Sequence, residues 1–147
     1  MKTAATRFPL GFLFILSLLL SGCASYDARI EKGYDLAHLQ RFFIIHNPSD
    51  NHGLDHQIAA ALQARGLKAE IGPLTMMPEE TQAVIVYQDR WGWDFGEHLV
   101  YLQIDAREPQ KSQAFASASL VTTIPLRESS TVSVNRLIDR LFAGKKS

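Results

Sequence analysis

The sequence predicts an α+β domain, in which two amphipathic helices cover one face of a mainly antiparallel sheet of four or five strands. Three observations predict this fold. Residues 83–107 join a β-branched apolar run to strict alternation, which is typical of two long strands connected by a bend. Residues 54–65 and 131–143 each carry an apolar stripe at helical spacing. Turn residues separate these segments, and the expected element order is roughly β-α-β-β-β-β-α.

Each expected element has a local signal. Apolar or alternating runs mark the strands, and Asn47-Pro48 ends the first one because proline cannot continue a ladder. The first helix has Asn51 as its expected N-cap, with Asp50 as the alternative, and the second has Ser130 or Thr131. The expected strands cover 42–46, 67–71, 83–91, 97–107 and 113–123, and the expected helices cover 54–65 and 131–143.

The first residues predict export and lipidation. Lys2 and Arg7 accompany an apolar run over 8–20, which is short for a membrane span and typical of a signal-peptide core. The run ends in Leu20-Ser21-Gly22-Cys23, which resembles the lipobox of bacterial lipoproteins. The resemblance implies that residues 1–22 are a signal peptide and that Cys23 receives a diacylglycerol and an N-acyl chain such as palmitate. Three acyl chains would anchor the protein permanently.

The residues after Cys23 predict the location. In the sorting rule of many Gram-negative lipoproteins, Asp directly after the acylated cysteine retains the protein in the inner membrane. Ala24 stands there instead, so the resemblance implies the outer membrane, with the chain facing the periplasm. Residues 23–40 are expected to form an acylated N-terminus and polar tether, and residues 41–147 a single periplasmic domain. Cys23 is the only cysteine, so neither a disulfide nor a thiol nucleophile is expected elsewhere.

The composition of the processed chain excludes some functions. Removal of the first 22 of 147 residues leaves 125, enough for one domain with a hydrophobic core. Lys2 and Arg7 leave with them, so 13 of the 15 basic side chains remain against 15 acidic ones. Nucleic-acid binders need a basic stripe, and we therefore expect no nucleic acid as a partner.

Several segments resemble a known group of proteins. Tyr34-Asp35-Leu36 precedes a strand, a helix ends in Leu62-Gln63-Ala64-Arg65-Gly66-Leu67, and Val84-Ile85-Val86-Tyr87 forms a strand core. Together they resemble small bacterial lipoproteins that carry a widespread domain of unknown function, and Asp89 to Asp94 resemble one branch of that group. The similarity covers most of residues 34–143, and it implies the fold rather than a chemical activity.

A histidine-rich loop is the densest cluster of titratable residues. His52 and His56 lie one helical turn apart and are weak candidates to hold a metal together with His46. Against this, Asn51 and Gly53 stand where the motif of metallo-β-lactamase-like hydrolases has histidines, and a helix N-terminus disfavours cations. No Gly-x-Ser-x-Gly motif is present either. We therefore expect no metal, no other cofactor and no catalytic residue.

A tryptophan segment is the strongest candidate for partner binding. Trp91 and Trp93 share one face if the strand is regular, where they could grip a partner or stack on a sugar. The alternative is that they close the end of the core, with Trp91 the more buried of the two. Arg90 is expected to form local ion pairs, and Gly92 to mark a bulge or a close approach. The candidate residues are Asp89, Arg90, Trp91, Trp93 and Asp94.

These observations predict an outer-membrane lipoprotein that is not an enzyme. Its periplasmic domain is expected to bind or support another cell-envelope component, most directly an envelope protein, while the lipid anchor contacts the membrane. One alternative is a small periplasmic metal-dependent hydrolase that uses the loop from His46 to His56. The other is a glycan- or peptidoglycan-binding module that uses Trp91 and Trp93.

Overall fold

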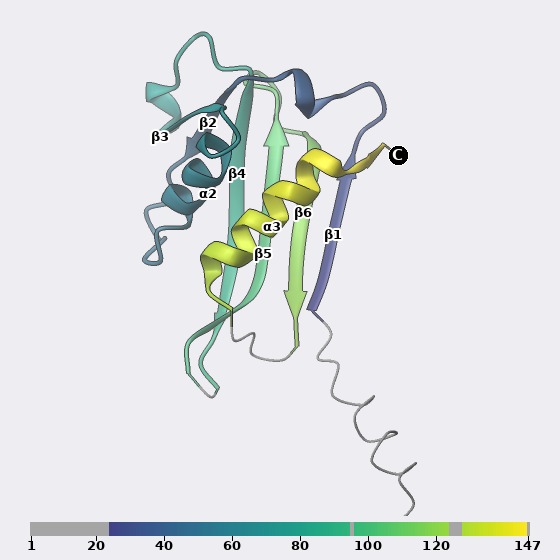
Figure 1. Cartoon of the computed structure of the whole chain (residues 1–147). Coiled ribbons are helices and arrows are strands. Elements are labelled where there is room, and N and C mark those ends of the chain that lie inside the picture. The colour runs from purple at the N-terminus through teal and green to yellow at the C-terminus, as the bar shows by residue number, and fades with distance from the viewer. Residues whose placement is uncertain (1–23, 95, 124–127, 147) are drawn as a thin grey trace, which may run out of the picture.

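One mixed sheet of seven strands organises the fold in the computed structural model, which describes residues 24–94, 96–123 and 128–146. Two helices, α2 (Leu54–Gln63) and α3 (Ser130–Ala143), pack on this sheet, and two short 3-10 turns, η1 (Leu36–His38) and η2 (Leu74–Met76), lie in its connections (Figure 1). The strands are β1 (Ala24–Ile30), β2 (Arg41–Ile45), β3 (Lys68–Gly72), β4 (Ala83–Gly92), β5 (His98–Arg107), β6 (Ala114–Thr122) and β7 (Lys145–Lys146).

The sheet is larger and more mixed than the sequence predicts. Its strand order is β3-β2-β4-β5-β6-β1-β7. β3, β2 and β4 pair in parallel, whereas β4, β5, β6 and β1 pair antiparallel, and the two-residue β7 runs parallel to β1. The parallel part arises because β2 and β3 are joined through α2, and parallel neighbours need such a crossover. The α+β class is therefore correct, and the expected mainly antiparallel sheet of four or five strands is only a rough match.

The predicted tether is wrong over its first part, because Ala24–Ile30 forms β1 inside the sheet. β1 pairs antiparallel with β6 from Ala24 opposite Thr122 to Ile30 opposite Ala116. Its inward positions, Ala24, Tyr26, Ala28 and Ile30, alternate with polar residues, so the segment carries the period-two pattern of a half-buried strand, which the prediction of a tether overlooked. The sheet consequently includes residues 24–30, which precede the expected domain start at residue 41.

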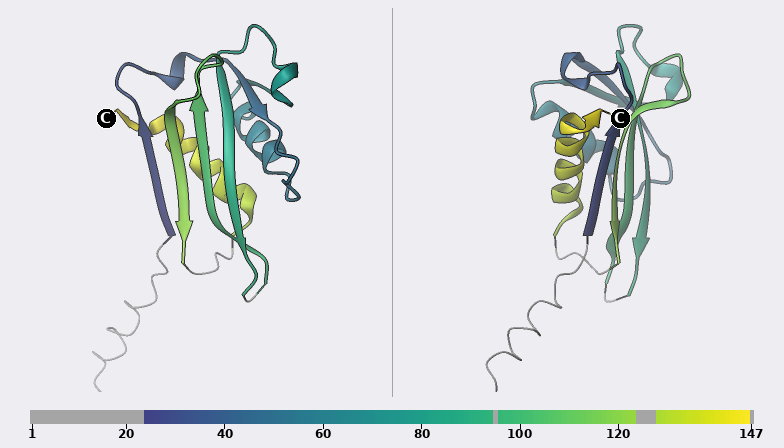
Figure 2. Two further views of the ribbon diagram at one scale, coloured as in Figure 1. Left: turned by 180° about the vertical axis from the view of Figure 1, so that it is seen from behind. Right: turned by 90° about the vertical axis from the view of Figure 1, so that its right-hand side faces the viewer.

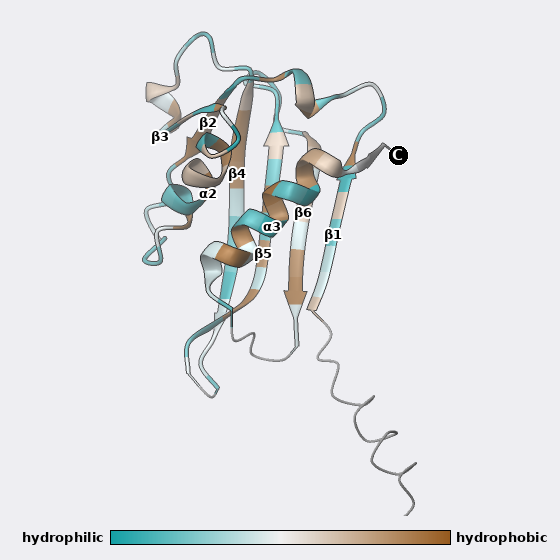
Figure 3. Cartoon of the chain, viewed as in Figure 1, coloured by the Kyte–Doolittle hydropathy of each residue, from teal (hydrophilic) through white to brown (hydrophobic). Residues whose placement is uncertain are grey.

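Both helices cover the same face of the sheet, and the opposite face carries no helix (Figure 2, right). The apolar side of α3 lies over the central strands (Figure 3), where Ala116 and Ala118 are almost fully buried. These small side chains let α3 approach β6 closely. The fully buried side chains between the layers each stabilise the fold by about 1.5–3 kcal/mol. They include Ile58, Leu62, Ile85, Leu102, Ile104, Leu120, Leu137, Ile138 and Leu141.

The helix starts differ slightly from those expected. The residue before α2 is Gly53, whose φ of 66° is in the left-handed region that favours glycine. The predicted cap Asn51 is therefore wrong, and the alternative Asp50 caps α2 from a distance, since its carboxylate accepts hydrogen bonds from the N–H groups of Leu54 and Asp55. α3 has Ser129 as its N-cap, one residue before the expected position. No helix in the described ranges is long and apolar enough to cross a membrane.

Candidate functional site

The histidine-rich loop and the tryptophan segment form one site. β2 lies beside β4 in parallel, so the loop that follows β2 runs past the second half of β4. The His52 ring stacks on the Trp91 ring with centroids 3.7 Å apart and an interplanar angle of 12°. The Nε2 atom of His52 is also 2.7 Å from Oε1 of Glu97, across the hairpin. The sequence predicts two separate candidates, and the topology joins them.

Asp50 ties the loop to the sheet. Its carboxylate accepts hydrogen bonds from the Tyr87 hydroxyl at 2.8 Å, from the His52 amide at 2.9 Å, and from the first amides of α2. Burial alone would raise the pKa of Asp50, but these four donors outweigh it and lower the pKa. The pKa of Tyr87, by contrast, is raised by burial and by the neighbouring Asp50 carboxylate, so its hydroxyl stays protonated and remains a donor. Asp50 is therefore a structural anion at the base of the site.

His46 has a buried carboxylate partner. Asp55, in the first turn of α2, is only 2% exposed, and its Oδ2 is 2.7 Å from Nδ1 of His46. The other carboxylate oxygen is 4.0 Å from Nε2 of His56, whose side chain is exposed. Such a carboxylate orients an imidazole ring, which suits a structural histidine as well as a general base.

The three histidines do not converge. His46 and His56 contact Asp55, whereas His52 contacts Trp91 and Glu97. In the part of the chain that the structure describes, no group of three or more His, Cys, Asp or Glu side chains is arranged to hold a metal ion. Nδ1 of His52 is buried and has no hydrogen-bond partner among the described residues.

The two tryptophans have different environments. Trp91 is partly buried, packs against the core, and donates a hydrogen bond from Nε1 to Asp89 at 2.8 Å. Trp93 is 73% exposed and lies beyond the last residue of β4. The expectation of a shared face required a regular strand through both residues, and this condition is not met because β4 ends at Gly92, between them. The expected difference in burial is correct.

The other residues of the tryptophan segment have different contacts from those predicted. Arg90 lies over the Tyr101 ring at 6.0 Å and, within the described ranges, forms no ion pair with Asp89 or Asp94, so that prediction is wrong. Asp94 is instead 3.9 Å from Nε2 of His98.

Gly92 lies where side chains of β5 come close to the backbone of β4. A Cβ atom at this position would lie 2.8 Å from Nε2 of His98 and 2.8 Å from Cγ2 of Val100. The close approach predicted for Gly92 is therefore present, and it involves side chains of β5. The register shifts between Arg90 and Trp91, which leaves Val100 of β5 as the extra, unpaired residue of a bulge. Glycine suits position 92 because a Cβ atom there would force the side chains of His98 and Val100 to move.

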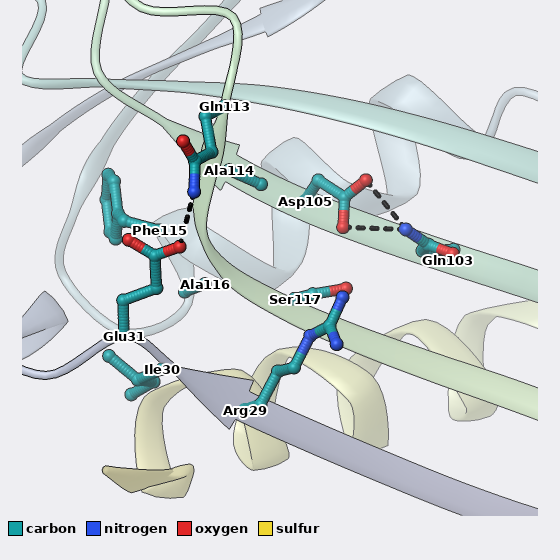
Figure 4. Close-up of a pocket in the computed structure, with 10 residues that line it drawn as sticks. All are labelled: Arg29, Ile30, Glu31, Gln103, Asp105, Gln113, Ala114, Phe115, Ala116 and Ser117. Atoms are coloured by element: carbon teal, nitrogen blue, oxygen red, sulfur yellow. Dashed lines mark hydrogen bonds between the residues drawn. The ribbon is translucent and has the colours of Figure 1, made fainter. Parts of the chain in front are cut away.

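A polar hollow on the open face of the sheet was not predicted. It encloses about 450 Å³ at the end of the sheet opposite to Ala24, between β5, β6 and β1 (Figure 4). Small side chains of β6, such as Ser117, form its floor, while longer side chains from β5 and β1 form its walls. A smaller hollow of about 200 Å³ continues it and shares Arg29, Gln103 and Ser117. The polar side chains of the main hollow are Arg29, Glu31, Gln103, Asp105, Gln113 and Ser117.

Hydrogen bonds fix the walls of this hollow. The amide of Gln113 donates to Glu31 at 2.8 Å, and the amide of Gln103 donates to both carboxylate oxygens of Asp105, at 2.9 and 2.8 Å. The hollow therefore presents carboxylate oxygens on both walls. Its only signal in the sequence is that polar residues occupy every second position of β5 and β6. Any solvent-exposed face of a sheet shows the same alternation.

Comparisons with known proteins give the fold alone. No family model matches the chain. No curated protein matches it in sequence. Among solved structures, it is similar to the PelC dodecamer from Paraburkholderia phytofirmans, with a TM-score of 0.58 and 16% identity over 82% of this chain and 96% of that one. A single-residue variant of that dodecamer, in space group C2, gives a TM-score of 0.55 and 16% identity over 82% and 95%.

Proposed function

We propose that the chain is an outer-membrane lipoprotein whose periplasmic domain binds or supports another cell-envelope component without catalysing a reaction. Acyl chains on Cys23, which lies outside the described residues along with the signal peptide over 1–22, would anchor it. The observation that carries the proposal is the lipobox Leu20-Ser21-Gly22-Cys23 behind a basic and an apolar segment. All described elements follow Cys23 in the sequence, so cleavage before Cys23 would remove none of them.

The contacts of the titratable residues support a binding role. Asp50 caps α2 and holds Tyr87, Asp55 holds His46, and His52 stacks on Trp91. Each therefore stabilises the fold of the site, whereas a catalytic group needs a reactive atom beside a bound substrate. The exposed part of the same site, with Trp93 and Arg90, is available to a partner. Trp and Arg are enriched among the residues that dominate binding energy in interfaces.

Assembly with further copies of the chain belongs to the same proposal. The solved structures to which the fold is similar are dodecamers. We propose that this domain also forms a closed ring of its own copies, because closed symmetry satisfies every subunit equally. Native mass spectrometry of the acylated protein in detergent tests this. Species larger than one chain are expected, and a monomer at micromolar concentration would refute self-assembly.

A labelling experiment tests the anchor. Cells that express the wild-type protein and grow with radioactive palmitate should contain a labelled protein in the outer-membrane fraction. Cys23→Ser should give an unlabelled precursor that retains residues 1–22, because the acylated sulfur is missing. Ser25→Ala is the matched control, since Ser25 is exposed and lies just past the processing site. Normal labelling of Cys23→Ser would end the lipoprotein assignment.

Two further measurements address the partner and the alternatives. A photo-crosslinker at the exposed Arg90 should capture an envelope protein in living cells, whereas one at the exposed His38, far from the site, should not. Stoichiometric zinc or copper that is lost in His52→Ala would favour the hydrolase instead. Retention on peptidoglycan sacculi that is lost in Trp93→Ala would favour the glycan-binding module, which the exposure of Trp93 supports.

A further inference from the structure

The β4–β5 hairpin lies at the anchored end of the domain. One cross-sheet row of paired residues runs through Ser25, Val121, Tyr101 and Arg90. Ala24, the residue after Cys23, is only one position beyond this row. The hairpin continues past that level through the pair of Gly92 and His98, and it extends beyond β1 and β6 in each view of the molecule (Figures 1 and 2).

The length of this extension follows from the register. Trp93 lies two residues beyond the level of Ala24 when counted along β4, and three when counted along β5, because of the bulge. At about 3.4 Å per residue, the hairpin passes Ala24 by about 7–10 Å. The Cα atom of Cys23 is about 3.8 Å from that of Ala24. The polar headgroup layer of one leaflet is roughly 5–8 Å thick. With the strands upright, acyl chains on Cys23 therefore place Trp93 at headgroup depth.

The side chain at this position suits that depth. Trp93 is 73% exposed, the most exposed of the large apolar side chains in the described ranges. An indole combines a large apolar surface with one N–H donor, and tryptophan is enriched where membranes meet water. Asp94, whose side chain is 74% exposed, would stay among the headgroups and limit insertion.

The base of the hairpin is fixed, so the position of Trp93 is determined by the fold. Trp91 is held between His52 and its hydrogen bond to Asp89, and His52 is linked across the hairpin to Glu97. Gly92 permits the close packing of the two strands at the same level.

We propose that this hairpin is a second membrane contact, in which Trp93 lies among the headgroups of the leaflet that holds the acyl chains of Cys23. The inference rests on the proposed lipid anchor. An anchor at one point leaves the domain free to tilt, whereas a second contact on a neighbouring strand pair sets the sheet upright. The open face of the sheet and its hollow then face sideways, away from the bilayer.

Tryptophan fluorescence tests this contact. The full acylated protein is reconstituted into vesicles of phosphatidylethanolamine with and without brominated acyl chains. In the Trp91→Phe variant, Trp93 is the sole tryptophan, so selective excitation of tryptophan reports it alone. Its emission should shift to the blue, and bromine should quench it by about twofold, as expected for an interfacial indole. The matched variant Trp93→Phe reports only Trp91, which should show little quenching. The difference between wild type and Trp93→Phe gives the same quantity if Trp91→Phe unfolds.

The outcomes separate the inference from its premise. Flotation of the vesicles shows whether the protein is attached. Protein that fails to float refutes the lipid anchor, and the membrane contact with it. Protein that floats but shows neither a blue shift nor bromine quenching of Trp93 overturns the membrane contact alone. A blue shift without quenching also overturns it, and assigns Trp93 to a protein interface.

Discussion

Asp50→Ala should destabilise the domain more than its half-exposed position suggests. The substitution removes an acceptor from four donors at once: the amides of His52, Leu54 and Asp55, and the hydroxyl of Tyr87. Loss of a helix cap costs about 0.5–2 kcal/mol. The Tyr87 side chain is buried, and a buried hydroxyl left without a partner costs about 1–3 kcal/mol. The expected loss in the free energy of unfolding is therefore about 1.5–5 kcal/mol.

Urea unfolding at pH 7, on a soluble form that begins at Ala24, measures this loss. Asp50→Asn is the matched control, because asparagine caps helices about as well as aspartate. It should lose only about 1 kcal/mol, since its one carbonyl oxygen can still accept from Leu54, Asp55 and Tyr87, whereas its NH2 group cannot accept from the His52 amide. Tyr87→Phe removes the hydroxyl itself, so adding it to Asp50→Ala should cost less than the sum of the two single losses.

The pH dependence gives an independent check. The pKa of Asp50 is lower in the folded state than its ordinary value. Its contribution to stability is therefore present above the unfolded pKa of about 3.9 and is lost as the pH falls through the folded pKa. The stability difference between wild type and Asp50→Asn should shrink as the pH is lowered from 5 towards about 2. A loss below about 0.5 kcal/mol in Asp50→Ala, or a difference that does not change with pH, would show that Asp50 does not anchor the site.

Three further sets of substitutions test the packing, each by thermal or urea unfolding. Ile58→Ala and Leu137→Ala should each cost about 2–5 kcal/mol, because both side chains are fully buried and would leave cavities; unchanged melts would mean that the helices do not cover the sheet. Trp91→Ala should cost about 1–3 kcal/mol and Trp93→Ala less than about 0.5, and the reverse order would contradict their environments. Gly92→Val should cost about 1–3 kcal/mol, since its Cβ would meet His98 and Val100; wild-type stability would show that the hairpin relaxes freely.

Long apolar or periodic segments made most of the fold predictable. The expected strands and helices of residues 42–143 lie within two residues of the observed ones, since burial on one face imposes a period that can be read directly. The tether prediction missed the same kind of pattern in β1, where Ala24, Tyr26, Ala28 and Ile30 alternate with polar residues. Two of these four inward residues are alanines, which weakens the apolar contrast. The partner strand of β1 is β6, which is far away in the sequence, so no local pattern indicates that β1 pairs with it.

The residues of the candidate site were predictable, but their arrangement was not. Trp91 and His52 are each conspicuous in sequence, yet their contact depends on β2 and β4 being neighbours. The parity rule does not apply to Trp91 and Trp93 because it assumes a regular strand, and β4 ends at Gly92, between them. The hollow escaped prediction for a third reason. Its lining residues follow the ordinary polar alternation of a sheet face, and only the three-dimensional arrangement shows that small residues lie between longer ones.

The place of β1 also decides how the domain bears mechanical load. Any drag between a membrane-held Cys23 and the rest of the molecule enters at Ala24 and runs along the strand axis. All seven residues of β1 pair with β6 in continuous register. Force parallel to the strands loads these backbone hydrogen bonds together, in shear, whereas a pull across them would open one bond at a time. Under forced unfolding the rupture rate, rather than the equilibrium stability, sets the lifetime. With the proposed anchor on Cys23, the strand that follows it would thus also resist extraction of the domain.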